Sequence, residues 1–140
     1  MNTFQLKIIA SNKIFFDGEA QSLTVPLVDY GSEAFLANHA NCIVPIDAGE
    51  MKIKDSAGKV TMAFVGSGFL EFLDNTAMLV CVSAEMPNEI DERRAQEAKE
   101  RAEEELRQKR SQLEYYHSQA NLARAMERLK VKKNYDLYLK

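Results

Sequence analysis

The residues of this chain best suited to hold an anion are its seven arginines, all of which follow position 92. Arg94 and Arg101 are seven residues apart, so they share one face if the segment is helical. Arg124 and Arg128 are four residues apart and share a face of a later segment. A guanidinium group presents a planar fork of N–H donors that matches phosphate oxygens. If the segment folds back as a hairpin, the four arginines can converge on a polyphosphate.

Two carboxylates lie near this set in the sequence. Asp91 precedes Arg94 by three residues on the same helical face, and Glu85 lies just ahead of the helical segment. Both can accept hydrogen bonds from a sugar or a base. A solvated charged face with local ion pairs has the same spacing, and each such pair contributes about 0.5 kcal/mol or less. The spacing alone therefore leaves open whether the arginines bind a ligand.

Catalytic and metal-binding chemistry has little support in this sequence. The two histidines, His39 and His117, lie on separate segments, and no serine or cysteine stands beside a base. Gly66-Ser67-Gly68 leads into a strand pattern rather than a helix, which indicates a bulge or a tight corner instead of a nucleotide loop. Cys42 and Cys81 lie in apolar runs and are expected to be free thiols. We expect no catalytic residues, because a small enzyme would need a base beside a nucleophile. We expect no metal ligands, because no His, Cys, Asp or Glu spacing resembles a metal site.

Charge is distributed unevenly along the chain. Residues 1–86 contain five lysines and ten acidic residues, whereas residues 87–140 contain thirteen basic and eleven acidic residues. Acidic residues dispersed among the basic ones would repel a polynucleotide, so we expect no nucleic acid among the partners. The sequence has no secretory signal pattern and no apolar run near the ~20 residues that span a bilayer.

The first 86 residues have the pattern of a β domain. Short apolar runs recur about every 8–12 residues with turn sequences between them, which predicts a sandwich or a barrel. Hairpins are expected around the turn residues 55–58 and 73–76. Pro26 lies inside one of the runs and favours an edge strand or a bulge there.

The remaining residues, 87–140, have the pattern of helices. Pro87 suits a joint between domains, and neither glycine nor proline follows it. Apolar residues recur at helical spacing in two stripes, Ala95, Ala98, Ala102 and Leu106, and then Leu113, Tyr116, Ala120 and Ala123. A break between two helices is expected somewhere between 110 and 118. Burial of apolar surface contributes ~25 cal/mol per Å2, and alanine stripes bury little area. We therefore expect a folded hairpin and an extended rod to have similar free energies.

Several short motifs occur in an order that resembles a known family, the epsilon subunits of F-type ATP synthases. The similarity covers about residues 3–131. The motifs are Val65-Gly66-Ser67-Gly68-Phe69-Leu70-Glu71, Ile90-Asp91-Glu92-Arg93-Arg94-Ala95, Ala98-Lys99-Glu100-Arg101-Ala102 and Arg124-Ala125-Met126-Glu127-Arg128-Leu129.

The resemblance implies an α+β fold in which a β-sandwich of about ten strands, residues 1–86, precedes an antiparallel two-helix hairpin, residues 87–140. It implies a non-catalytic rotor subunit of the central stalk, which couples ion flow through the membrane ring to ATP synthesis. The implied partners are the gamma subunit, the ring of c subunits and, when the helical arm extends to inhibit ATP hydrolysis, the alpha/beta hexamer. The implied location is peripheral, on the cytoplasmic face of the bacterial plasma membrane.

The resemblance also carries over particular residues. ATP as a regulatory ligand would hold the arm folded, and the matching positions are Glu85, Asp91, Arg94, Arg101, Arg124 and Arg128. The matching positions for contact with the ring are Ser32, Glu33 and His39. The loop of residues 31–41 lacks most of the glycines and prolines usual in the family. The alternative is a β-sandwich interaction module whose helical arm is a fixed docking element and binds no nucleotide.

Overall fold

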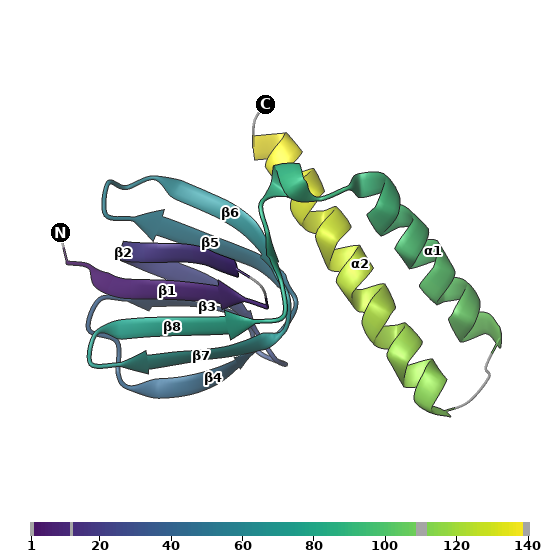
Figure 1. Cartoon of the computed structure of the whole chain (residues 1–140), viewed down its shortest axis with the longest axis horizontal. Coiled ribbons are helices and arrows are strands. Elements are labelled where there is room, and N and C mark those ends of the chain that lie inside the picture. Colours follow the sequence, from purple (N-terminus) through teal and green to yellow (C-terminus); the bar gives the residue numbers. More distant parts are fainter. Residues whose placement is uncertain (1, 12, 109–111, 139–140) are drawn as a thin grey trace. The chain divides into compact units, whose positions relative to one another are not determined.

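Nine strands and then two long helices follow one another in the computed structural model, which describes residues 2–11, 13–108 and 112–138 (Figure 1). The chain divides into two compact units, Met1–Glu85 and Met86–Lys140. The first contains the strands and the second the helices. The predicted α+β fold, a β-sandwich followed by two helices, is confirmed.

The long second strand joins the two layers of the sandwich. The strands are β1 (Phe4–Ala10), β2 (Lys13–Leu27), β3 (Gly31–Leu36), β4 (Cys42–Ile46), β5 (Gly49–Asp55), β6 (Val60–Val65), β7 (Gly68–Leu73), β8 (Thr76–Cys81) and β9 (Ala84–Glu85). Hydrogen bonds connect them in the order β1-β8-β7-β4-β2-β5-β6-β9. The first half of β2 pairs with β1 and its second half pairs with β3. The β1–β8 pair is parallel, whereas the other pairs are antiparallel.

The two hairpins expected from turn residues are confirmed. Strands β5 and β6 pair across the turn that contains Gly58, whose φ of 85° favours glycine. Strands β7 and β8 pair across Asp74 and Asn75, whose φ values are 49° and 59°. Two central residues with positive φ form the turn whose twist matches that of the flanking strands.

Alternate side chains from both layers form one apolar core. Its largest members are almost fully buried: Phe4, Phe35, Phe64, Phe72, Leu6, Ile8, Leu23, Ile46, Met51, Ile53, Leu70 and Leu79. The ring of Phe72 lies 5.3 Å from that of Phe4 and 6.3 Å from that of Phe35, measured between centroids. Burial of whole aromatic and aliphatic side chains, each worth roughly 1.5–3 kcal/mol, stabilises this unit.

The Gly66-Ser67-Gly68 segment is a tight corner, as predicted. The Gly66 N–H donates to the Ser83 carbonyl at 2.8 Å, and the Ser67 carbonyl accepts from the Val82 N–H at 2.9 Å. A Cβ atom on Gly68 would lie 2.0 Å from the Val80 carbonyl oxygen. The backbones approach so closely here that a side chain is excluded.

A short 3-10 turn, η1 (Pro87–Glu89), leads into helices α1 (Glu92–Gln108) and α2 (Gln112–Tyr138). The apolar stripe predicted on α1 is confirmed, since Ala95 and Ala102 are buried and Ala98 and Leu106 are partly buried. In the described part of the chain, no helix has the length and apolar character needed to cross a bilayer.

The stripe predicted on α2 is wrong. Tyr116, Ala120 and Ala123 are exposed, and the buried residues of α2 are Ser118, Ala125 and Val131. The side chain of Leu113, the fourth residue of the predicted stripe, is outside the described ones. The polar residue at position 118 hides the true stripe from a search for apolar periodicity, because the stripe continues from it through Leu122, Ala125 and Leu129 at helical spacing.

The break expected somewhere between 110 and 118 falls at the start of that range, since α1 ends at Gln108 and α2 begins at Gln112. Residues 115–118, including His117, lie inside α2 rather than at a break, because helix packing outweighs the weak intrinsic propensity of these residues. The connection itself, residues 109–111, is outside the described residues.

Candidate functional site

A single hydrogen bond shows which positions of the two helices lie opposite one another. The Ser118 hydroxyl on α2 donates to a carboxylate oxygen of Glu105 on α1 at 2.6 Å. In an antiparallel pair, each step back along α1 from Glu105 is matched by a step forward along α2 from Ser118. Arg94 is eleven residues before Glu105, and Arg128 is ten residues after Ser118. With a rise of ~1.5 Å per residue, these two arginines lie at nearly the same level along the hairpin.

The other two arginines match in the same way. Arg101 is four residues before Glu105, and Arg124 is six residues after Ser118. Their levels therefore differ by roughly 3 Å, while the Arg101 level lies roughly 10 Å from that of Arg94. The four guanidinium groups thus leave the hairpin at two successive levels, with one arginine from each helix at each level.

Helical phase places the four arginines on one side of the hairpin. Each directly precedes a residue of the helix–helix interface, in the pairs Arg94-Ala95, Arg101-Ala102, Arg124-Ala125 and Arg128-Leu129. One residue is a turn of ~100° about the axis of a right-handed helix. In two antiparallel helices, the same rotation away from the facing line leads to the same side of the pair. The structure therefore brings these sequence-predicted residues to one face, which we call the arginine face.

The guanidinium groups on α1 are open to solvent. Arg94 and Arg101 are exposed, and within the described residues neither forms an ion pair with a side chain. The ion pairs of α1 lie elsewhere around the helix, for example Arg93–Glu97 at 3.6 Å. On α2, Arg124 and Arg128 are partly buried, and Arg124 donates to the side-chain oxygen of Asn121. The two N–H forks on α1 are thus available to an incoming anion.

The two acidic candidates have different positions. Asp91 is the N-cap of α1, because its side-chain oxygen accepts a hydrogen bond from the Arg94 backbone N–H at 3.1 Å. The same carboxylate therefore fixes the first turn of the helix that carries Arg94. Glu85 is the last residue of β9 and belongs to the first unit.

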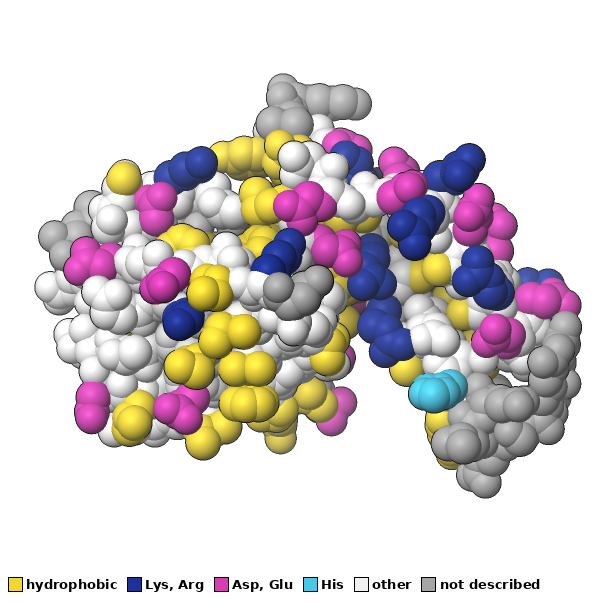
Figure 2. Space-filling model, viewed as in Figure 1, with side chains coloured by type: hydrophobic (Ala, Val, Ile, Leu, Met, Phe, Trp, Pro, Cys, Tyr) yellow, Lys and Arg dark blue, Asp and Glu magenta, His cyan; other side chains and the backbone are white. Residues whose placement is uncertain are grey.

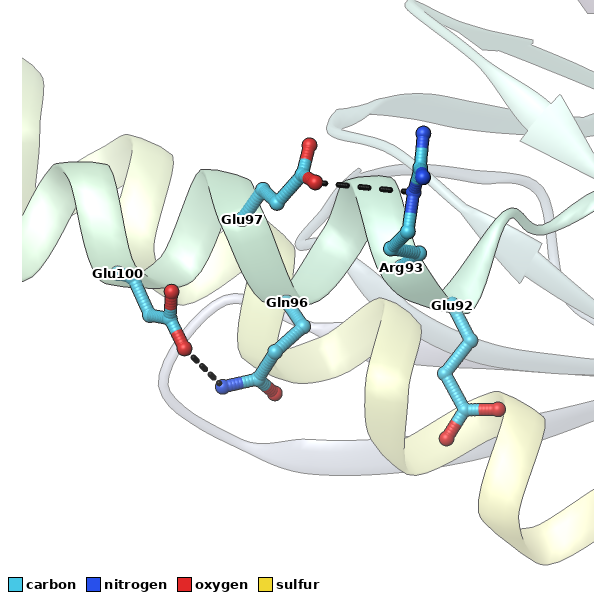
Figure 3. A pocket seen from close by; sticks show the side chains of 5 residues that line it. All are labelled: Glu92, Arg93, Gln96, Glu97 and Glu100. Atoms are coloured by element: carbon cyan, nitrogen blue, oxygen red, sulfur yellow. Dashed lines mark hydrogen bonds and ion pairs between the residues drawn. The ribbon is translucent and has the colours of Figure 1, made fainter.

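A shallow groove on α1 does not suit an anion. It is lined by Glu92, Arg93, Gln96, Glu97 and Glu100 (Figure 3). Three carboxylates and one guanidinium group line it; the Arg93 guanidinium is paired with Glu97, and Gln96 donates to Glu100 at 3.3 Å. The groove therefore carries a net negative charge and repels phosphate groups.

Two of the three residues expected to contact the ring lie together. The His39 Nε2 and a Glu33 carboxylate oxygen are 3.7 Å apart. The His39 ring also packs on Phe35, with 4.6 Å between centroids. Ser32 neighbours Glu33 on β3, so its side chain leaves the opposite face of the strand.

Asparagines hold the loop that carries His39, and their role was not predicted from the sequence. The Asn38 N–H donates to the Asn75 side-chain oxygen at 2.6 Å, and the Asn75 side-chain nitrogen donates to the Thr3 carbonyl at 3.0 Å. The Asn41 side-chain oxygen accepts from the Asp74 N–H at 2.9 Å. Side-chain hydrogen bonds therefore order this loop where glycines and prolines are sparse. The Asp74-Asn75 turn was the available signal, since asparagine favours such bonds.

Both cysteines are free thiols. Burial raises the pKa of the Cys42 thiol, and the nearby Glu33 carboxylate raises it further. Burial also raises the pKa of the Cys81 thiol, although a hydrogen bond from the Ser83 backbone lowers it in part. A thiol held protonated is a weak nucleophile. Within the described residues, no three His, Cys, Asp or Glu side chains cluster as metal ligands.

An exposed apolar surface lies over β4, β7 and β8 (Figure 2). Its residues alternate with the core residues of the same strands: Ile43, Phe69, Leu73, Met78 and Val82. Ile43 is 69% exposed and Met78 is 42% exposed. The register of β4, β7 and β8 brings these side chains onto one face of the sheet, which we call the apolar face. The exposed Glu71 also lies on this face, between Ile43 and Met78 in the register. An exposed face rich in apolar side chains marks an interaction surface more often than a bare monomer surface.

Family models match both units of the chain. The model of the beta-sandwich domain of the ATP synthase delta/epsilon chain matches residues 3–87. The model of the long alpha-helix domain of the same chain matches residues 88–133.

Individual relatives are similar over nearly the whole chain. The ATP synthase epsilon chain of Ruminiclostridium cellulolyticum is 40% identical over 129 residues, which are 92% of this chain and 95% of that protein. The ATP synthase epsilon chain of Caldanaerobacter subterraneus subsp. tengcongensis is 39% identical over 134 residues, 95% of this chain and 96% of that protein.

Solved structures share the fold at low sequence identity. A chain in a cryo-EM structure of the Euglena gracilis mitochondrial ATP synthase, with OSCP, F1 and c-ring, has a TM-score of 0.77 at 16% identity. That match covers 98% of this chain and 82% of that chain. A chain in a structure of the Tetrahymena thermophila mitochondrial ATP synthase central stalk and c-ring has a TM-score of 0.63 at 12% identity, covering 91% and 95%.

Proposed function

This chain belongs to the ATP synthase delta/epsilon family, whose members are non-catalytic subunits of the complex, and we propose that its helical hairpin is an ATP-responsive brake. In this role the chain is a rotor subunit of the central stalk that couples ion flow through the membrane ring to ATP synthesis. The folded hairpin permits ATP hydrolysis, and the extended arm inhibits it.

The observation that carries this proposal is the arginine face. Arg94 and Arg128 lie at one level of the hairpin and Arg101 and Arg124 at the next, all on one side. A triphosphate that lies along this face can accept hydrogen bonds from both helices at once. Each charge-assisted hydrogen bond of this kind contributes roughly 1.5–3 kcal/mol. Because the groups meet only when the helices are antiparallel neighbours, the ligand favours the folded hairpin.

The helix–helix interface is weak enough for a ligand to matter. The buried residues of the two helices are Ala95 and Ala102 on α1 and Ser118, Ala125 and Val131 on α2, so most of them are small. Alanine side chains bury little area, so the interface contributes little free energy. A ligand shifts such an equilibrium by its difference in affinity for the two states, and ~1.4 kcal/mol changes the ratio tenfold.

The sandwich supplies the contacts that hold the subunit in the complex. The apolar face suits a protein partner, and we assign it to the gamma subunit of the stalk. Glu33 and His39 form a polar pair on the same domain. We assign this pair, together with Ser32, to the contact with the ring of c subunits. The extended arm reaches the alpha/beta hexamer. These contacts would hold the protein at the cytoplasmic face of a bacterial plasma membrane through the complex.

Variants of the arginine face test the proposal. We expect Arg124→Ala and Arg128→Ala each to weaken ATP binding about tenfold or more and to strengthen inhibition of ATP hydrolysis in the assembled complex. Arg93→Ala is the matched control, because Arg93 pairs with Glu97 away from the arginine face. Calorimetry of the isolated chain measures the affinity.

Two outcomes would overturn parts of this proposal. If all three variants bind ATP as the parent does, the arginine face is not the ligand site. If the parent binds no ATP and inhibition does not depend on ATP, the hairpin is a fixed docking arm.

A further inference from the structure

Ser118 is the one buried polar residue among those that the structure describes, and it lies at the interface of two helices whose other inward residues are alanines and leucines. It is 3% exposed, and its hydroxyl donates to the Glu105 carboxylate at 2.6 Å across the hairpin. A buried hydroxyl without a partner is costly, and a bond to a charged acceptor is among the stronger hydrogen bonds. Its satisfaction therefore depends on the pairing of the two helices.

Alanine alone cannot fix that pairing. Ala95 and Ala102 on α1 and Ala125 on α2 are identical small knobs. If α2 slides along α1 by one helical turn, about 5.4 Å, one alanine of α1 replaces another, while Leu122 or Leu129 takes the place of Ala125 on α2. The alanines of α1 therefore accept more than one alignment, and the leucines and the Ser118 hydrogen bond oppose the slide. The same slide would separate Ser118 from Glu105 and exchange a bond to a charged acceptor for, at best, a weaker one to a backbone carbonyl of its own helix.

We propose that the Ser118–Glu105 hydrogen bond fixes the register of the hairpin, and that this register sets the two arginine levels of the proposed ATP site. This second part rests on the proposed function. A slide of one turn would bring Arg124 to about the present level of Arg128, or the reverse, because the two are four residues apart. Only one of the two levels would then keep an arginine from each helix. Ser118 is thus a positioning residue that does not touch the ligand. A single buried polar group that selects one register of packed helices has precedents in coiled coils.

The hydrogen bond has a second consequence for Arg101. Glu105 lies four residues after Arg101 on the same flank of α1, so a released Glu105 carboxylate can pair with that guanidinium group. While Ser118 holds Glu105, Arg101 keeps its donors available to a phosphate. Loss of the hydroxyl therefore weakens anion binding both by register and by competition.

The test separates this role from ordinary stabilisation. Ser118→Ala removes the hydroxyl but leaves a small apolar side chain and a better helix former, and the released Glu105 is exposed to water. We expect its helix content and thermal unfolding to equal or exceed those of the parent. We expect its ATP dissociation constant to rise about threefold to tenfold. Ser118 does not touch ATP, so its loss weakens binding only indirectly, through the alignment of the arginines and the release of Glu105. Glu105→Gln keeps an acceptor for Ser118 and should bind ATP at least as well as the parent.

Register is measured directly by electron spin resonance distances in the full chain. Spin labels at Gln96 and Met126, both exposed and on different helices, are placed in a Cys42→Ser, Cys81→Val background. When residues 105 and 118 are unchanged, we expect one narrow distribution of the distance between the two labels, and we expect the same for Glu105→Gln. Ser118→Ala should give a broader or two-component distribution. Ala120→Ser, at an exposed position of α2, is the control and should leave the distribution unchanged.

Each result decides one of the two ideas. A Ser118→Ala distribution as narrow as that of the parent, with an unchanged ATP dissociation constant, would overturn the register assignment. If Ser118→Ala broadens the distribution and weakens ATP binding, the whole inference is supported. If the parent binds no ATP, the proposed function fails, while the distances still decide whether Ser118 fixes the register.

Discussion

At the residue scale, Asp91 shows how one carboxylate serves the helix and the proposed ligand site together. Its side-chain oxygen caps α1 by accepting from the Arg94 N–H. The negative charge also favours the positive end of the helix dipole. Because the cap fixes where α1 begins, it also fixes the phase of Arg94 and Arg101 relative to α2. The sequence motif that contains Asp91 therefore has a structural role even before any ligand binds.

Substitution of Asp91 separates these roles. Asp91→Ala removes the cap and should lower the free energy of unfolding of the helical unit by about 1 kcal/mol. Asp91→Asn keeps a capping oxygen, so its free energy of unfolding should lie within a few tenths of a kcal/mol of that of the parent. Urea unfolding followed by circular dichroism measures both values. Equal losses in the two variants would show that the charge, rather than the cap, stabilises the helix.

The buried thiol of Cys81 predicts a pH dependence. Burial raises its pKa in the folded state above the ordinary thiol value, so the folded state retains a proton that the unfolded chain releases. The contribution to stability is complete below the ordinary thiol pKa and is lost as the pH rises through the folded-state pKa. We expect the stability difference between the parent and Cys81→Ala to narrow from pH 8 to pH 10. A difference that stays constant or widens over that range would contradict this expectation.

At the element scale, the β7–β8 turn does more than reverse the chain. Asn75 occupies a position with φ of 59° and bonds through its side chain to Asn38 and Thr3. The turn therefore supports the loop that presents His39. This coupling makes the turn part of the proposed ring contact, although it lies 36 residues away in the sequence.

Replacement of Asn75 by glycine tests this support. Asn75→Gly keeps the positive φ accessible but removes two hydrogen bonds, so we expect a loss of about 1–2 kcal/mol in the free energy of unfolding. Asp74→Gly is the matched control at the neighbouring turn position, where φ is 49°, and it should be nearly neutral. Chemical denaturation of both variants gives the comparison. Equal effects would show that the turn geometry, rather than the Asn75 side chain, matters.

Local patterns predicted the elements better than their partners. The turns at 55–58 and 73–76 and the stripe from Ala95 to Leu106 are visible in the sequence, because turn chemistry and helical periodicity are local. The parallel β1–β8 pair and the shared strand β2 are not, because distant packing selects them. The stripe on α2 was misplaced because Ser118 interrupts it, and that interruption proved to be the hydrogen bond between the helices.

The candidate site was predictable to a similar extent. Helical spacing places Arg94 with Arg101 and Arg124 with Arg128, but it cannot say how one helix is aligned with the other. That alignment came from the Ser118–Glu105 hydrogen bond. The asparagine bonds around His39 were unpredictable for the same reason, since they join segments far apart in the sequence.

At the scale of the whole molecule, the two units have surfaces of different character. The sandwich presents the apolar face over β4, β7 and β8, whereas charged side chains of both signs cover the helical unit (Figure 2). An exposed apolar face favours stable binding to a protein partner. A charged hairpin whose two helices are held by a weak interface can rearrange reversibly. This division matches the proposed roles of anchor and brake.

Charge on the apolar face should break the anchor without harming the fold. Met78→Lys places a charge at a position that is 42% exposed in the isolated chain. The free energy of unfolding of this variant should therefore be within about 0.5 kcal/mol of that of the parent. Buried against a partner, the same charge is costly, and we expect at least tenfold weaker association with the gamma subunit. Val60→Lys, at an exposed position on β6, is the control. Co-purification and calorimetry measure association, and unchanged binding by Met78→Lys would remove the apolar face from the interface.

The proposed brake requires that ATP bridge the two helices along the arginine face. Amide NMR of the isolated full chain, titrated with ATP, tests this most directly. We predict saturable shifts at Arg94, Arg101, Arg124 and Arg128 and at their neighbours on both helices, with small changes along the groove of Glu92, Arg93, Gln96, Glu97 and Glu100. Shifts confined to one helix, or a spectrum unchanged at millimolar ATP, would contradict the account.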